Sequence, residues 1–210
     1  DLAAAEIHLG GEPDARHRFV GQHQAGVGEP DPDQAFDVTE EGEQGALLFD
    51  RPDIAVGRAG VHRGGMAERE PADDEAIRHL NDLAFGGPFE GRLIEELREA
   101  FIDAVELVAV EDGAIVGHIL FSALTTMVDD DAVPTLPLAP MCVHPDRQGS
   151  GIGTALVEAG LDLARHREWQ AVVVLGHPDY YPRFGFSAEL ASGLDSPFDG
   201  DSFMALELVP

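Results

Sequence analysis

The stretch from Leu138 to Leu175 constrains the fold more than any other part of this chain. An apolar run ends at Val143, a glycine-rich turn spans Gln148–Gly153, an amphipathic segment covers Thr154–Arg167, and a second apolar run covers Ala171–Leu175. Apolar residues at helical spacing in the third part predict a helix with a wide buried face. Short apolar runs are typical of strands, and the second run, Ala171–Leu175, is typical of a strand that is buried on both faces. The order predicts a β-α-β unit.

Glycines at the first strand-to-helix turn of such a unit favour phosphate binding, because several N–H groups converge at the positive end of a helix. Two kinds of phosphate loop are excluded. A Walker loop needs a lysine, and all 13 basic residues of this chain are arginines. A dinucleotide fingerprint needs a third glycine, but that position falls on Thr154 or Leu156, depending on the register. The pattern that remains is Gln148-x-x-Gly151-x-Gly153.

This pattern resembles the Q/R-x-x-G-x-G/A motif with which the GNAT superfamily of N-acetyltransferases binds acyl-coenzyme A. A second GNAT-like motif, Tyr181-x-x-x-Gly185-Phe186, follows at the expected distance. The run HPDYYPRFGF, which begins at His177, is similar to one bacterial and archaeal subgroup. The resemblance covers residues 66–210. It implies an α/β fold with a mixed, mostly antiparallel twisted central sheet, a splayed pair of strands, and helices on both faces.

The rest of the chain fits this layout. Periodicity predicts helices that begin near Asp74 and Gly91, strands at Val105–Val110 and Ala114–Thr126, and a final strand at Phe203–Leu208. The first strand of the family could only be Met66–Glu70. Residues 1–65 are rich in glycine and poor in apolar clusters. We therefore expect a GNAT domain at 66–210, preceded by a disordered or non-native extension at 1–65.

The resemblance implies that acetyl-CoA is the co-substrate and assigns residues to it. Its pyrophosphate would bind the backbone N–H groups of the glycine-rich turn, which comprises Gln148, Gly149, Ser150, Gly151, Ile152, Gly153 and Thr154. Its pantetheine arm would pair with the strand backbone at Met141, Cys142 and Val143, and an N–H near Val143 would bond the thioester oxygen. No metal is expected.

Acetyl transfer to an amine needs a base for the ammonium proton and an acid for the departing thiolate. Tyr181 matches the tyrosine that GNAT enzymes commonly use as the acid, although an aromatic packing role is open. The base is undecided, because the strand before the turn has no glutamate. His118 and His177 are candidates that also have structural interpretations, and a chain of water molecules is the default route. A lone strand cysteine such as Cys142 is usually only a small apolar residue.

The amino-acid composition limits the classes of partner that the protein is expected to bind. A formal net charge of −27 argues against nucleic acid and anionic membranes, and it mildly favours a cationic acceptor. Such acidity in a chain without lysine fits either a high-salt cytoplasm or a GC-rich genome that replaces lysine with arginine. One cysteine and the lack of a long apolar run predict a cytoplasmic protein. We expect it to be a monomer or a homodimer. We expect an N-acetyltransferase acting on a small-molecule or peptide amine. The alternative is a non-catalytic acyl-CoA-binding or regulatory module.

Overall fold

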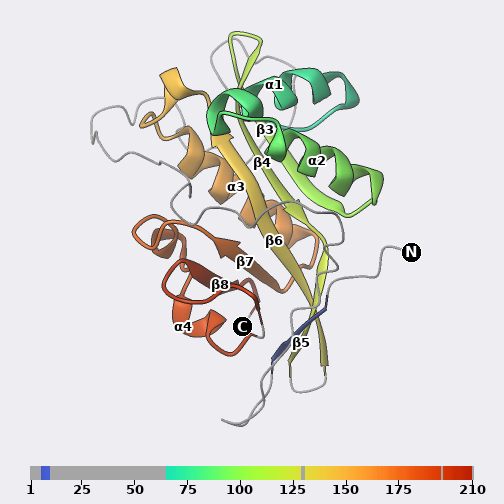
Figure 1. Ribbon diagram of the computed structural model, residues 1–210, viewed down its shortest axis with the longest axis vertical. Coiled ribbons are helices and arrows are strands. Elements are labelled where there is room, and N and C mark those ends of the chain that lie inside the picture. The colour runs from blue at the N-terminus through green and yellow to red at the C-terminus, as the bar shows by residue number, and fades with distance from the viewer. Residues whose placement is uncertain (1–5, 10–64, 129–130, 195, 210) are drawn as a thin grey trace. The chain divides into compact units, whose positions relative to one another are not determined.

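The computed structural model describes residues 6–9, 65–128, 131–194 and 196–209 (Figure 1). The chain divides into two compact units. Of the described residues, 65–122 and 139–166 form what we call the α1–α3 unit, and 6–9, 123–128, 131–138, 167–194 and 196–209 form what we call the β7–β8 unit. The predicted extension at 1–65 lies outside the described residues, apart from Glu6–Leu9 and Gly65. The predicted domain boundary therefore stays a prediction.

The α1–α3 unit combines three helices with an antiparallel group of strands. In chain order its elements are β2 (Gly65–Glu68), α1 (Asp74–Phe85), α2 (Phe89–Glu99), β3 (Asp103–Glu111), β4 (Ala114–Ser122), the end of β6 (Asp131–Val143) and α3 (Ile152–His166). β2 pairs with β3, β3 pairs with β4, and both pairings are antiparallel. On the other side of β4, the His144 N–H donates to the Val116 carbonyl at 2.8 Å, which ties the end of β6 to this group.

The alternating side chains of β4 show that helices cover both faces of the α1–α3 unit. Phe121 faces α3, where a Cβ added to Gly160 would lie 2.3 Å from its ring. Its neighbour Leu120 points the other way and packs in a buried cluster with Ile77 of α1 and Ile94 of α2. Figure 1 shows α1 and α2 next to each other beside β3 and β4. Helices on both faces were predicted, and this prediction is confirmed.

The β7–β8 unit has its own core. Its elements are β1 (Glu6–Leu9), β5 (Leu124–Val128), the first part of β6, β7 (Ala171–Leu175), α4 (Ala188–Ala191) and β8 (Phe203–Glu207). β5 pairs with β6, and β7 with β8, antiparallel; β1 with β5, and β6 with β7, pair in parallel. Val173 packs with Leu124, Ala191 and Phe203, so β7 is buried as its apolar run predicted.

Several predicted boundaries change. The strand predicted at Ala114–Thr126 is two strands, because β4 ends at Ser122 and β5 begins at Leu124. The apolar run continues through both strands, so periodicity gave no sign of the break. The first strand is present as β2, and the helices predicted near Gly91 and Thr154 each begin two residues earlier. None of the described helices is long and apolar enough to cross a membrane.

Candidate functional site

The glycine-rich turn connects β6 to α3 and exposes helix N–H groups. Gly149 and Gly151 have φ values of 71° and 85°, a region that favours glycine because it has no Cβ. A Cβ built on Gly151 would meet no heavy atom of the described residues within 4 Å, so the described part of the chain leaves the space beside this glycine open. The first N–H groups of α3, from Ile152 on, have no acceptor inside the helix. Together with the helix dipole they form a site for an anion.

Side chains hold the turn in shape. The Ser150 hydroxyl donates to the Arg147 carbonyl at 2.5 Å, and the Gln148 amide donates to the Val143 carbonyl at 3.4 Å. The Arg147 guanidinium donates to the Glu111 carboxylate at 2.5 Å. Since Arg147 is already paired with an acid, the backbone N–H groups are the main donors that the turn offers to an anion.

The end of β6 leads into this turn. Cys142 is buried, whereas its neighbours Met141 and Val143 are half-buried. Burial, and then the charge of Glu90, raise the pKa of the Cys142 thiol, and the nearby backbone of His118 offsets only part of this rise. The thiol therefore stays protonated at neutral pH and is a poor nucleophile.

Tyr181 is packed in the β7–β8 unit, where it begins a 3₁₀ turn that ends at Phe184. A Cβ on Gly176 would lie 2.2 Å from its ring, so glycine is required there for the ring to fit. Tyr180 and Phe186 contact the ring edge-on, with centroid distances of 5.1 and 5.6 Å. Burial, and then the nearby Tyr180, raise the pKa of Tyr181. Its hydroxyl is therefore protonated at neutral pH.

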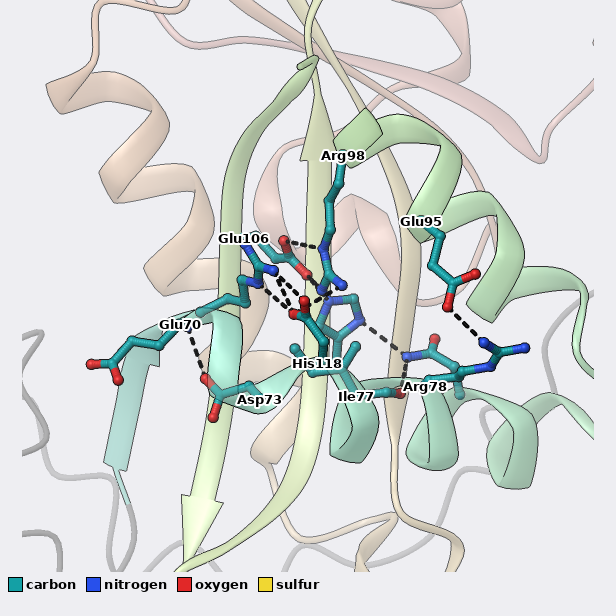
Figure 2. Close-up of polar contacts among 11 residues, drawn as sticks. Glu70, Asp73, Ile77, Arg78, Glu95, Arg98, Glu106 and His118 are labelled. Atoms are coloured by element: carbon teal, nitrogen blue, oxygen red, sulfur yellow. Dashed lines mark hydrogen bonds and ion pairs between the residues drawn. The ribbon is translucent and has the colours of Figure 1, made fainter. Parts of the chain in front are cut away.

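The two candidate histidines differ in accessibility. His177 is half-buried, and its carbonyl accepts the N–H groups of Tyr180 at 3.0 Å and Tyr181 at 3.3 Å, which begins the turn that holds the tyrosines. His118 on β4 is fully buried. Both of its ring nitrogens are engaged: Nε2 lies 2.9 Å from Glu106 Oε1, and Nδ1 lies 3.3 Å from Asn81 Nδ2 (Figure 2).

These contacts define the protonation of the buried group. Burial lowers the pKa of His118 more than Glu106 raises it. Burial raises the pKa of Glu106, but the hydrogen bonds from His118 and Arg98 outweigh it, and the pKa of Glu106 falls below its usual value. His118 is therefore neutral, with Nε2–H donating to the Glu106 carboxylate and Nδ1 accepting from Asn81. Sequence reasoning missed Glu106, Arg98 and Asn81. The only signal was an acidic residue inside the apolar strand Val105–Val110.

The site residues predicted from the sequence are thus divided between the two units. The turn, the end of β6 and His118 belong to the α1–α3 unit, while Tyr181 and His177 belong to the β7–β8 unit. Within the described ranges, no group of three or more His, Cys, Asp or Glu side chains is placed to hold a metal ion.

Sequence comparison finds one family model and relatives that are named as N-acetyltransferases. A model of the Acetyltransferase (GNAT) family matches residues 75–186. Uncharacterized N-acetyltransferase YjhQ of Escherichia coli (strain K12) is 38% identical over 128 residues, which are 60% of this chain and 71% of the relative. Uncharacterized N-acetyltransferase YhbS of the same strain is 35% identical over 126 residues, 60% of this chain and 73% of the relative.

Structure comparison finds neighbours crystallised with coenzyme A species. A GNAT family acetyltransferase from Brucella melitensis, in complex with acetyl-CoA, is 33% identical with a TM-score of 0.60, and the match covers 71% of this chain and 90% of that one. YhbS from Escherichia coli, in complex with CoA, is 28% identical with a TM-score of 0.63, and the match covers 76% and 86%.

Proposed function

Because this chain belongs to the acetyltransferase (GNAT) family, we propose that it moves the acetyl group of acetyl-CoA to a primary amine of a small molecule or peptide, by direct attack in a ternary complex. The chain is an acyltransferase, and its co-substrate is acetyl-CoA. The observation that carries the proposal is the open glycine-rich turn at the start of α3. The chain has a single cysteine, which is buried and cannot form an internal disulfide. This fits a reducing compartment, so we place the activity in the cytoplasm.

The turn fits the pyrophosphate of acetyl-CoA in both charge and shape. A pyrophosphate needs several N–H donors and close approach to the backbone, and residues 148–154 offer both where Gly149 and Gly151 take positive φ. Met141, Cys142 and Val143 would present strand backbone to the pantetheine arm. The N–H of Val143 would stabilise the negative charge that develops on the thioester oxygen.

Direct attack is favoured over an acyl-enzyme. The only cysteine in the chain is Cys142, and its buried thiol has a raised pKa. A thiol that stays protonated does not compete with an incoming amine for the acetyl group. Cys142 is therefore excluded as an acyl carrier, which supports direct attack of the amine on the thioester.

Tyr181 would donate the proton that the departing thiolate needs. Its raised pKa keeps the hydroxyl protonated throughout the neutral range, and the tyrosinate that the transfer leaves would regain its proton from solvent. The amine must first lose its own proton. His118 has no exposed surface and both of its ring nitrogens are bonded. We therefore propose that a chain of water molecules carries this proton to solvent. Of the two candidate histidines, only half-buried His177 is accessible as an alternative base.

A panel of amines tests the proposal. The full chain is mixed with acetyl-CoA and with a polyamine, an aminoglycoside or a lysine-containing peptide, and release of the CoA thiol is followed. We expect release that depends on at least one of these amines, since a net charge of −27 attracts cations. Calorimetric binding of acetyl-CoA with no release for any amine would instead support the non-catalytic acyl-CoA-binding module.

A further inference from the structure

A chain of alternating charges runs through the α1–α3 unit and joins both of its first helices to the sheet (Figure 2). We call it the Glu106 network; it comprises Arg69, Asp74, Asn81, Arg98, Glu106 and His118. Asp74 and Asn81 come from α1, Arg98 from α2, Glu106 from β3 and His118 from β4. Elements α2, β3 and β4 therefore meet at one buried carboxylate, and α1 is joined to it through Arg98 and His118.

Glu106 is the centre of this network. Its side chain is 5% exposed, and it accepts hydrogen bonds from Arg98 Nε at 3.1 Å, from a second nitrogen of the same guanidinium, and from His118 Nε2 at 2.9 Å. Arg98 also contacts Asp74 Oδ1 at 3.1 Å, and Arg69 holds the same carboxylate at 2.7 Å. Every charged group therefore has an oppositely charged neighbour.

Stability alone does not explain a buried group of this kind. Removing two charges from water is costly, and replacing a buried ion pair by apolar side chains of similar volume is often neutral or stabilising. Apolar residues already surround the network, since Ile77, Ile94 and Leu120 form a buried cluster on the same face of β4 as His118. A directional fork between Arg98 and Glu106 adds what apolar packing does not, namely one fixed placement of α2 on β3.

The network also reaches the strand to which the proposed function assigns the thioester. β4 lies beside β6 in the sheet, and the N–H of His144, the residue after Val143, donates to the Val116 carbonyl of β4 at 2.8 Å. His118 is two residues further along β4, so helices α1 and α2 are joined to the Met141–Val143 segment through this strand. We propose that Glu106 is a positioning residue for acetyl transfer, which holds α1 and α2 in register with the thioester-binding end of β6. This inference rests on the proposed function.

The test replaces the charges but keeps the packing. The triple variant Arg98→Met/Glu106→Leu/His118→Leu removes the buried charges and leaves Asp74 paired with Arg69. The matched control is Arg78→Gln/Glu95→Gln, because this ion pair also joins α1 to α2, at 2.7 Å, but lies on the surface. For each protein one measures the melting temperature, the acetyl-CoA Kd, kcat/KM for the amine, and hydrogen exchange of the α1 and α2 amides.

We expect the triple variant to melt at or above the parent temperature and to bind acetyl-CoA within about twofold of the parent, yet to lose at least tenfold in kcat/KM for the amine. Its α1 and α2 amides should exchange faster. The control should match the parent in all four measurements. A merely structural role of Glu106 would lower the melting temperature and kcat/KM together, or change neither.

A folded triple variant with kcat/KM within twofold of the parent would overturn the inference. If the triple variant does not fold, the double variant Arg98→Met/Glu106→Gln, which removes the same ion pair with smaller changes of shape, is judged by the same criteria. If the parent acetylates no amine, the proposed function fails on its own. The positioning role is then decided by hydrogen exchange: unchanged protection of α1 and α2 at an unchanged melting temperature refutes it.

Discussion

At the scale of single residues, Tyr181 is the side chain on which the proposed chemistry depends most. Its ring is fixed by Gly176 and by two aromatic neighbours, and its raised pKa keeps the hydroxyl protonated. We predict that Tyr181→Phe lowers kcat by about 10²–10⁴-fold, the usual contribution of a general acid, with little change in acetyl-CoA affinity. Steady-state kinetics with the accepted amine measures this.

The control for this change is Tyr180→Phe, which removes a hydroxyl from the adjacent ring in the same turn. We expect it to retain kcat within a fewfold of the parent. A Tyr181→Phe enzyme that keeps kcat within about twofold would return Tyr181 to a packing role.

Because His118 is buried with a lowered pKa, we predict that the free energy of unfolding falls in acid. Burial lowers its pKa in the folded state, so below about pH 6.5 the unfolded chain binds a proton that the folded chain does not. This contribution to stability is complete above that pH and is lost as the pH falls, by at most about 1.4 kcal/mol per pH unit. The lowered pKa of Glu106 adds a loss in the same direction below about pH 4.3.

Urea unfolding midpoints at pH 7 and pH 5 check this prediction. The parent and a control, His79→Gln, in which an exposed histidine of α1 is changed, should lose stability over this interval. His118→Gln should lose less, whatever its stability at pH 7. An equal loss in His118→Gln and in the parent would show that another group causes the acid sensitivity.

At the scale of elements, α2 ends with an unfavourable residue. Its closing hydrogen bonds run from Phe101 N–H to the Arg98 carbonyl at 2.9 Å and from Ile102 N–H to the Leu97 carbonyl at 3.1 Å. Phe101 therefore takes the position after the helix where glycine is preferred; its φ is 57° and it is 91% exposed. The left-handed conformation costs a non-glycine residue about 1–2 kcal/mol.

We predict that Phe101→Gly stabilises the protein by about 0.5–1 kcal/mol, because relief of this strain exceeds the extra chain entropy of glycine. The urea midpoint should rise with an unchanged m-value. Phe101→Ala is the control: it removes the exposed ring but keeps the Cβ, so the strain should persist. A Phe101→Gly protein no more stable than Phe101→Ala would contradict the explanation.

Elements with strong periodicity were the predictable part of this fold. Ala171–Leu175 was found from its apolar run, and α3 was found because its apolar face repeats over four turns. The Glu106 network was not predictable. Its members come together only when two helices and two strands pack, and no spacing along the chain relates Asn81 or Arg98 to Glu106. The glycine-rich turn was predictable because its chemistry is local.

At the scale of the whole molecule, we expect residues 66–210 to suffice for folding. Removing residues 1–65 takes one residue pair, Gly65↔Val110, from the ladder of β2 and β3, and three pairs remain. It also removes β1 from β5. A chain that begins at Met66 should fold, bind acetyl-CoA and melt within a few degrees of the full chain.

The control is a chain that begins at Ala72, which lacks β2 and leaves the edge of β3 uncovered. We expect it to be clearly less stable and prone to aggregate. If the chain from Met66 were insoluble, or did not bind acetyl-CoA, the first 65 residues would be part of the domain.

All of the proposed chemistry depends on acetyl-CoA binding at residues 148–154, and calorimetric titration of Gly151→Val tests this most directly. Gly113→Val is the matched control, because both glycines have nearly the same positive φ, 85° and 82°, and no heavy atom of the described residues would lie within 4 Å of the added Cβ. We predict that the parent and Gly113→Val bind acetyl-CoA with similar affinity, while Gly151→Val loses binding and still folds. An unchanged affinity in folded Gly151→Val would contradict the assignment of this loop.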